Sequence, residues 1–194
     1  MGVLRENAPV DSVITFAAQY LLFIMVAAFA AIWLFGTDRA GKLRLGGAAV
    51  IGLVLAVVFL AVAGKLHSDP RPFVQNPRLH PLFQHARDNG FPSDHSIAAG
   101  LIAGLVLFRS RLWGAVFALA AFCVAAARAA AHVHHVQDVA AGLILGGIAA
   151  VIGYYAAGAL LAILQSRTTL PLARARPRDP ARHAAPTARD SHHE

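Results

Sequence analysis

Long apolar stretches dominate the chain, and short polar segments separate them. Four stretches, at residues 13–35, 45–64, 112–131 and 137–165, are almost free of charged side chains. Each has about 20 residues or more, the length a helix needs to cross about 30 Å of hydrocarbon. A shorter apolar stretch covers residues 93–108. The pattern predicts an all-α fold, a polytopic membrane helical bundle with about five transmembrane helices.

The polar segments divide the chain further. Residues 1–12 are predicted to be an N-terminal surface segment, and residues 13–165 a single transmembrane domain. The longest internal polar stretch, 65–92, contains five prolines and cannot form regular helix. Residues 166–194 are rich in Pro, Arg, Ala and His and lack apolar periodicity, so we expect a disordered basic cytoplasmic tail.

Composition supports a membrane protein. The chain is 57% hydrophobic and 14% charged, whereas soluble domains are about 25% charged. The formal net charge of +7 comes largely from short loops and the tail. Such a distribution is typical of membrane topology and contact with anionic lipid, so we expect membrane lipids and no nucleic acid as partners.

The basic loops also predict an orientation. Residues 36–44, 109–111 and the tail fall on one side of a five-helix bundle, and basic loops mark the cytoplasmic side. The polar segments 65–92 and 132–138 then share the opposite face. We therefore expect a multi-pass protein of the inner (plasma) membrane whose clustered polar residues face the extracytoplasmic side.

One polar cluster has the spacing R-x5-H-x3-D, formed by Arg128, His134 and Asp138. If this segment is helical, His134 and Asp138 share a face. The carboxylate can then fix the imidazole tautomer and leave the other ring nitrogen as a nucleophile. Arg128 could bind phosphate oxygens bidentately. Alternatively, these are interfacial residues that anchor helix ends.

Two further clusters precede it. Ser93, Asp94 and His95 stand at a predicted helix N-terminus, which favours an anion; Ser93 adds a hydroxyl and His95 can donate a proton. The alternative is a plain helix cap. Lys65 and Arg71 could stabilise charge on a phosphoryl group. Alternatively, they are a snorkelling lysine and an ordinary loop arginine.

Together the clusters resemble the type 2 phosphatidic acid phosphatase superfamily of membrane lipid phosphatases, whose motifs are K-x6-RP, PSGH and SR-x5-H-x3-D. This chain has Lys65-x5-Arg71-Pro72, Pro92-Ser93-Asp94-His95 and Ala127-Arg128-x5-His134-x3-Asp138. It departs in three ways: the first motif is one residue shorter, Asp94 replaces a glycine, and Ala127 replaces a serine. Within the superfamily it looks most like the bacitracin-resistance-type undecaprenyl diphosphatases.

The resemblance implies a phosphatase mechanism without metal or cofactor. His134 would attack the terminal phosphorus to form a phosphohistidine, Asp138 would orient it, and His95 would protonate the leaving group and later activate water. The phosphate oxygens would be held by Lys65, Arg71, Ser93, Asp94 (through its backbone) and Arg128. The implied substrate is undecaprenyl diphosphate, cleaved to undecaprenyl phosphate and inorganic phosphate, which recycles the carrier lipid of cell-wall synthesis.

Three alternatives remain at this stage. A related phosphatase could act on phosphatidylglycerol phosphate or phosphatidic acid with the same catalytic residues. A metal or haem protein could use the cluster of His132, His134, His135 and Asp138, together with His67, His80 and His85 of the loop. A non-catalytic transport or assembly protein could use the cations to guide an anionic lipid.

Overall fold

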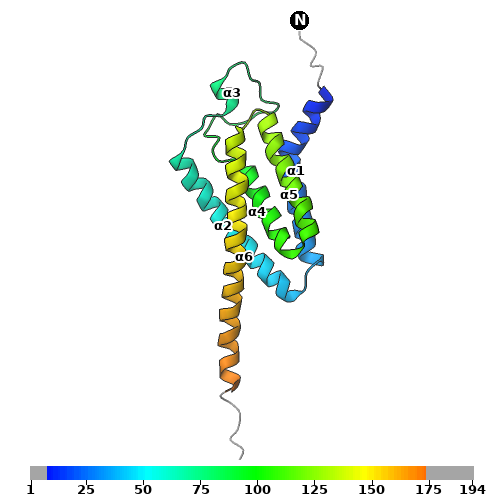
Figure 1. The fold of residues 1–194 in the computed structure, drawn as a ribbon, viewed down its shortest axis with the longest axis vertical. Coiled ribbons are helices and arrows are strands. Elements are labelled where there is room, and N and C mark those ends of the chain that lie inside the picture. The colour runs from blue at the N-terminus through cyan, green and yellow to red at the C-terminus, as the bar shows by residue number, and fades with distance from the viewer. Residues whose placement is uncertain (1–7, 174–194) are drawn as a thin grey trace, which may run out of the picture. The chain divides into compact units, whose positions relative to one another are not determined.

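Helices form all the regular structure in the part of the chain that the computed structural model describes, residues 8–173, with side chains from 9 to 167 (Figure 1). The elements are α1 (Ala8–Phe35), α2 (Arg39–Leu66), α3 (Pro72–Gln75), α4 (Asp94–Arg109), α5 (Arg111–Ala130) and α6 (Val136–Ala173). Helices α1, α2, α5 and α6 are each long and apolar enough to span a membrane. The predicted all-α polytopic bundle is confirmed.

The helices extend beyond the apolar stretches. Helix α1 begins at Ala8 rather than at residue 13, because Pro9 is tolerated in a first turn, where its missing N–H would have no partner. Helix α2 begins at Arg39 rather than at residue 45, and the Asp38 side chain caps it by accepting a hydrogen bond from the Gly41 amide at 3.1 Å. A local cap therefore marks the start of α2, and hydropathy alone predicts neither start.

Helix α6 runs to Ala173, past the predicted domain boundary at residue 165. The chain divides into two compact units, one through Leu161 and one from Ala162 onward. The rest of the predicted tail, residues 174–194, lies outside the described residues, as do residues 1–7 of the predicted surface segment. Every residue discussed below as part of the site belongs to the first unit.

Helix α4 is the central helix of that unit. It has only 16 residues, fewer than the roughly 20 that a lipid-exposed span needs. It packs against α1, α2 and α5, and its interior positions from Ile97 to Val106 are mostly buried. Because neighbouring helices surround it, α4 contributes core packing more than lipid-facing surface.

Glycine on α6 brings that helix close to the start of α4. A Cβ atom at Gly142 would lie 2.7 Å from both the Ser93 carbonyl oxygen and the Ser96 Cβ, so a larger residue there would force the two helices apart. Small residues of this kind permit close helix packing in membranes. As a result, the Ser93 amide donates a hydrogen bond to the Asp138 carbonyl at 3.1 Å.

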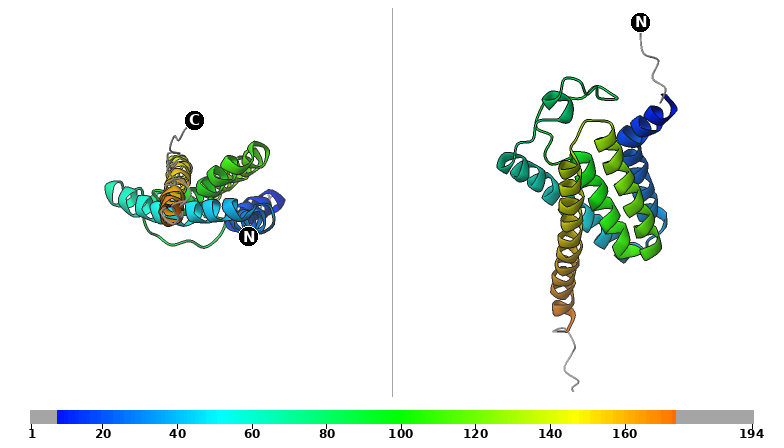
Figure 2. Two further views of the ribbon diagram at one scale, coloured as in Figure 1. Left: turned by 90° about the horizontal axis from the view of Figure 1, so that it is seen from below. Right: turned by 45° about the horizontal axis from the view of Figure 1, so that its top comes forward.

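Two connections meet at one end of the bundle, the long loop 67–93 that carries α3 and the turn 131–135 (Figures 1 and 2). The Asn89 side chain holds the long loop together. Its amide nitrogen donates to the Gly64 and His67 carbonyls at 3.0 and 3.1 Å, and its oxygen accepts from the Asp69 and Phe91 amides at 2.9 and 3.0 Å. The proline-rich segment thus takes a defined path across the helix ends.

Candidate active site

His134 lies between two arginines at this end of the bundle and is 2% exposed. Its Nε2 is 3.2 Å from a guanidinium nitrogen of Arg71 and 3.2 Å from one of Arg128. Its Nδ1 is 2.9 Å from the Gly90 carbonyl oxygen. A guanidinium can only donate and a carbonyl can only accept, so the ring carries its proton on Nδ1, and the unprotonated Nε2 accepts from the guanidinium groups.

The surroundings of His134 favour this neutral ring. Burial lowers the pKa of the His134 imidazole, and the nearby charges of Arg128 and Arg71 lower it further, although the hydrogen bond to Asp138 partly opposes them. Protonation of Nε2, which would give the ring a positive charge, is therefore disfavoured. An unprotonated imidazole nitrogen facing two cations is suited to nucleophilic attack on an anionic phosphorus centre.

Asp138 is completely buried behind the ring. Its Oδ2 lies 3.5 Å from the His134 Nδ1 and accepts a hydrogen bond from the His135 amide at 2.8 Å. The expected i, i+4 contact is present, but His134 lies in the turn before α6, which begins only at Val136, so the pair does not lie within one helix. The nearest acceptor for the His134 proton is thus the Gly90 carbonyl, and the Asp138 carboxylate adds a negative charge near the same ring nitrogen.

Arg71 reaches the site from the long loop and is 5% exposed. Its Nε donates to the Asp88 carboxylate at 2.8 Å, and one terminal nitrogen donates to the Val133 carbonyl at 2.8 Å. Burial alone would raise the pKa of Asp88, but the hydrogen bond and charge of Arg71 outweigh it and lower that pKa. Asp88, to which the sequence assigns no role, therefore remains an anion that holds Arg71 in place.

Arg128 projects from the last turn of α5 and is 2% exposed. The nitrogen that contacts His134 also lies 2.9 Å from the His85 Nε2 and 3.8 Å from Asp94 Oδ1. Its buried Nε has no hydrogen-bond partner among the described groups. Leaving a buried donor unpaired costs about 1–3 kcal/mol, so this nitrogen is a ready donor for an incoming anion.

The Asp94 side chain contacts His95 at the start of α4. Its Oδ1 lies 3.0 Å from the His95 Nδ1 and 2.7 Å from the His95 amide nitrogen. Ser93 occupies the cap position and is buried, but its hydroxyl accepts from the Ser96 hydroxyl at 3.1 Å instead of capping the helix. The predicted second cluster is thus brought to the site, with the carboxylate beside the histidine.

Lys65 is the predicted phosphate contact that the structure does not bring to the others. It stands in the last turn of α2 and is exposed. Among the side chains described from 9 to 167, no hydrogen bond or ion pair joins it to the arginines or histidines of the site. The shortened first motif therefore places only its arginine beside His134.

A group of possible metal ligands lies next to the site. Oxygen and nitrogen atoms of Asp69, His135 and Asp138 are all within 4.8 Å of one another. The two Asp69 oxygens already accept hydrogen bonds, from Gln75 at 3.0 Å and from Gln137 at 2.6 Å. His135 also lies 3.0 Å from Asp69. Protein donors therefore satisfy Asp69, and His134 does not belong to the group.

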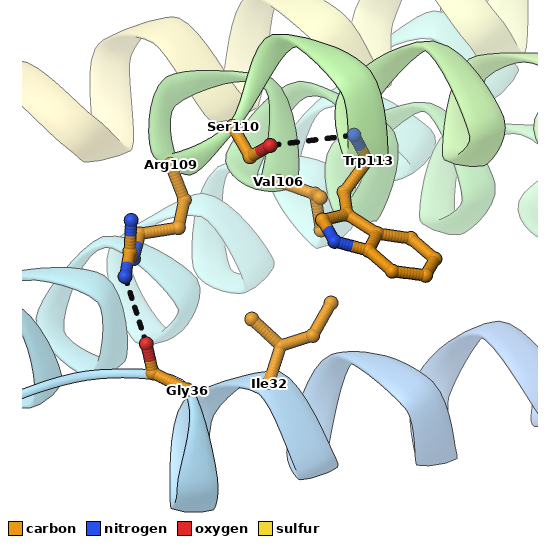
Figure 3. A pocket seen from close by; sticks show the side chains of 6 residues that line it. All are labelled: Ile32, Gly36, Val106, Arg109, Ser110 and Trp113. Carbon is orange, nitrogen blue, oxygen red and sulfur yellow. Dashed lines mark hydrogen bonds between the residues drawn. The ribbon is translucent and has the colours of Figure 1, made fainter.

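A separate cavity of about 290 Å³ lies near the opposite end of α4 (Figure 3). It is lined by Ile32, Gly36, Val106, Arg109, Ser110 and Trp113. Arg109 closes one side of it by donating to the Gly36 carbonyl at 2.8 Å. Because α4 begins at the histidine site and ends at this cavity, the two are distinct.

An all-α membrane bundle that places a neutral histidine beside two buried arginines holds the groups that suit an enzyme acting on phosphate. The family profile described as the PAP2 superfamily matches residues 45–162, which contain every residue of the site. The chain belongs to the PAP2 superfamily.

Similar proteins agree with this assignment. The chain is 32% identical over 161 residues to the bacitracin transport permease protein BcrC of Bacillus licheniformis, covering 83% of this chain and 78% of that protein. It is 32% identical over 155 residues to the undecaprenyl-diphosphatase BcrC of Bacillus subtilis strain 168, covering 79% and 76%. The crystal structure of Aquifex aeolicus LpxE has the same fold, with a TM-score of 0.63 at 23% identity over 77% of this chain and 87% of that one.

Proposed function

We propose that this protein is an integral membrane phosphatase that hydrolyses undecaprenyl diphosphate to undecaprenyl phosphate and inorganic phosphate. The observation that carries the proposal is the unprotonated Nε2 of His134, 3.2 Å from a nitrogen of Arg71 and 3.2 Å from one of Arg128. The name of the Bacillus subtilis relative supports this substrate. The role would be to recycle the carrier lipid of cell-wall synthesis.

In the first step, the Nε2 lone pair of His134 attacks the terminal phosphorus. The bond from phosphorus to the bridging oxygen breaks, and its electron pair leaves with undecaprenyl phosphate, whose oxygen takes a proton from His95. Arg71 and Arg128 donate to the phosphoryl oxygens, and the Gly90 carbonyl and Asp138 stabilise the positive charge on the ring. The product of this step is a phosphohistidine.

In the second step, water attacks the phosphohistidine. His95, which lost its proton in the first step, takes one from the water, and the bond between phosphorus and Nε2 breaks to release inorganic phosphate. The electron pair returns to Nε2 and restores the neutral ring. The buried hydroxyl of Ser93 and the backbone amide of Asp94, at the start of α4, are further donors for the phosphate oxygens.

The side chain of Asp94 has a part in this scheme beyond the phosphate contact predicted for the backbone of this residue. A carboxylate repels phosphate oxygens, whereas its Oδ1 lies 3.0 Å from the His95 Nδ1. A carboxylate in hydrogen-bond contact with an imidazole fixes its tautomer and orientation. We assign Asp94 to His95, so that each of the two histidines has its own aspartate.

The proposed site faces the extracytoplasmic side. Basic residues in the connection before α2 and at the α4–α5 junction lie at the other end of the bundle, and cytoplasmic loops are enriched in such residues. A single cysteine, Cys123, makes the orientation easy to test. In a Cys123→Ser background, Arg78→Cys should react with an impermeant maleimide in intact cells, and Arg111→Cys should react only after permeabilisation.

A substrate panel tests the activity itself. Purified protein in detergent should release phosphate from undecaprenyl diphosphate with a kcat/KM at least about tenfold above that for phosphatidylglycerol phosphate or phosphatidic acid, a difference of about 1.4 kcal/mol. Preference for either phospholipid would replace the proposed substrate and keep the chemistry. Binding of these lipids without any phosphate release would instead favour a transport or assembly protein.

A further inference from the structure

His85 contacts the site but belongs to none of the three sequence clusters. Its Nε2 lies 2.9 Å from a terminal nitrogen of Arg128. Its ring stands edge-on to that of His134, with the centroids 6.1 Å apart and the planes at 78°. Apart from His134, it is the only imidazole among the described side chains that is hydrogen-bonded to Arg71 or Arg128.

The protonation of His85 follows from its partner. Because a guanidinium can only donate, the His85 Nε2 must accept, and the ring is neutral in this arrangement. Burial and the neighbouring charges of Arg71 and Arg128 lower the pKa of His85 to about 4. At neutral pH, the ring therefore offers Arg128 an uncharged acceptor, which adds no second cation to a crowded positive pocket.

Packing of the loop determines where His85 lies. The Leu82 amide donates to the Ala131 carbonyl at 3.3 Å, and Leu82 and Phe83 pack against a small core that contains Ala131 and Val133. The ring of Phe83 also lies 5.8 Å from the guanidinium carbon of Arg128. The segment before His85 is thus attached to the turn that carries His134.

The nitrogen of Arg128 that bonds to His85 has competing partners. It lies 3.2 Å from the His134 Nε2 and 3.8 Å from Asp94 Oδ1. Without an acceptor at His85, the guanidinium would be free to turn toward the Asp94 carboxylate. An arginine binds phosphate in a bidentate way only when its planar fork faces the anion.

We propose that His85 is a positioning residue, which holds one nitrogen of Arg128 so that the buried Nε and the rest of the fork face the phosphate. The inference rests on the proposed phosphatase function. The loop 67–93 would then contribute two residues to the phosphate site, the motif arginine Arg71 and His85. His85 acts through Arg128, and it takes no proton from the substrate.

The test combines substitutions at His85 and Arg128. We expect His85→Ala to lower kcat/KM about tenfold and to weaken inhibition by orthovanadate by a similar factor. Both effects would follow from the loss of one interaction, the contact that Arg128 makes when His85 holds it. His85→Gln keeps an oxygen acceptor and should recover most of this loss. In an Arg128→Lys background, which lacks the fork, His85→Ala should change kcat/KM by less than about twofold.

His80→Ala is the matched control, since His80 is an exposed histidine of the same loop and should leave all three measurements unchanged. Additive effects of His85→Ala and Arg128→Lys, or a failure of Gln to rescue, would overturn the inference and leave His85 a purely structural residue. If the wild-type protein releases no phosphate from any lipid, the proposed function fails instead. Direct equilibrium binding of orthovanadate to the wild type and the variants then decides alone whether His85 positions Arg128.

Discussion

The Arg71 guanidinium lies 3.2 Å from the Nε2 of His134, although 63 residues separate the two along the chain. The same guanidinium is bonded to Asp88 and to the Val133 carbonyl. It is therefore held on two sides before any substrate arrives. Such preorganisation lets a charged group stabilise a developing charge without rearranging during the reaction.

Replacing Arg71 tests this preorganisation. Arg71→Lys keeps the charge but loses the planar fork, so it cannot hold Asp88, Val133 and a phosphate together. We expect kcat/KM to fall about 100-fold, equivalent to roughly 2.7 kcal/mol. Steady-state phosphate release from the lipid substrate measures it.

Two controls accompany this variant. Arg78→Lys, at an exposed arginine of the same loop, should be as active as the wild type. Lys65→Ala should cost much less than Arg71→Lys, because Lys65 is exposed. An equal loss at Lys65 would show that the lysine of the first motif also contacts the phosphate during catalysis.

Removal of the proposed nucleophile should nearly abolish turnover. His134→Ala removes the Nε2 atom that lies 3.2 Å from a nitrogen of each arginine, and we expect at least about a 1,000-fold loss in kcat, as for other enzymes that lose a nucleophile. His80→Ala serves as the control. Trapping of acid-labile phosphate on the wild-type protein but not on the variant identifies the intermediate, and full activity of His134→Ala would exclude the nucleophile assignment.

The part assigned to Asp94 predicts a dependence on the leaving group. Asp94→Gly restores the glycine of the family motif and removes the carboxylate from His95. Loss of effective general acid catalysis should lower kcat about tenfold or more for the lipid. With p-nitrophenyl phosphate, whose leaving group needs no proton, the loss should stay below about threefold. Equal losses on both substrates would point to phosphate binding instead.

The pH dependence of activity should reflect the neutral His134. Burial, Arg128 and Arg71 together lower the pKa of this ring despite the opposing bond to Asp138. A protonated Nε2 cannot attack, so activity is lost as the pH falls through the pKa of the folded protein. The acidic limb of kcat/KM should therefore lie below the ordinary histidine value of about 6.5. A limb at or above that value in wild-type protein contradicts this prediction.

Stability should also fall at acidic pH because of His85. The pKa of this ring is about 4 in the folded protein, against 6.5 for an unperturbed imidazole. The unfolded chain therefore binds more protons between these values, and stability declines as the pH falls from 6.5 towards 4 and is unaffected above. Arg71, Arg128 and His134 surround the ring and oppose its charge. Midpoints of thermal unfolding should fall less steeply with pH in His85→Gln, which does not titrate, and identical slopes would disprove the assignment.

The helices could largely be predicted from the sequence, because each membrane span requires a long run of apolar residues that can be recognised directly. The starts of α1 and α2 could not, since both helices begin before the apolar positions, α1 at Ala8 and α2 after the Asp38 cap. The central position of α4 could not be predicted from the sequence either. A short apolar stretch does not reveal that other helices surround it.

The candidate site divides in the same way. Spacing within one segment predicts that His134 and Asp138 are neighbours, and their distance of 3.5 Å agrees. It does not predict that the Gly90 carbonyl is the nearer acceptor at 2.9 Å. Nor does it predict the contacts of His85 and Asp88, because a proline-rich loop has no periodicity from which the position of a side chain could be derived.

The sequence by itself determined the class of fold, the family and which residue types are available for phosphate chemistry, since these depend on hydropathy and on local spacing. Only the tertiary structure decided which nitrogen of His134 is free, that Arg71 and Arg128 reach it, and that Lys65 does not. Each of these is a contact between segments far apart in the chain. Such contacts depend on the path of the loop 67–93 over the helix ends, which packing and hydrogen bonds set together.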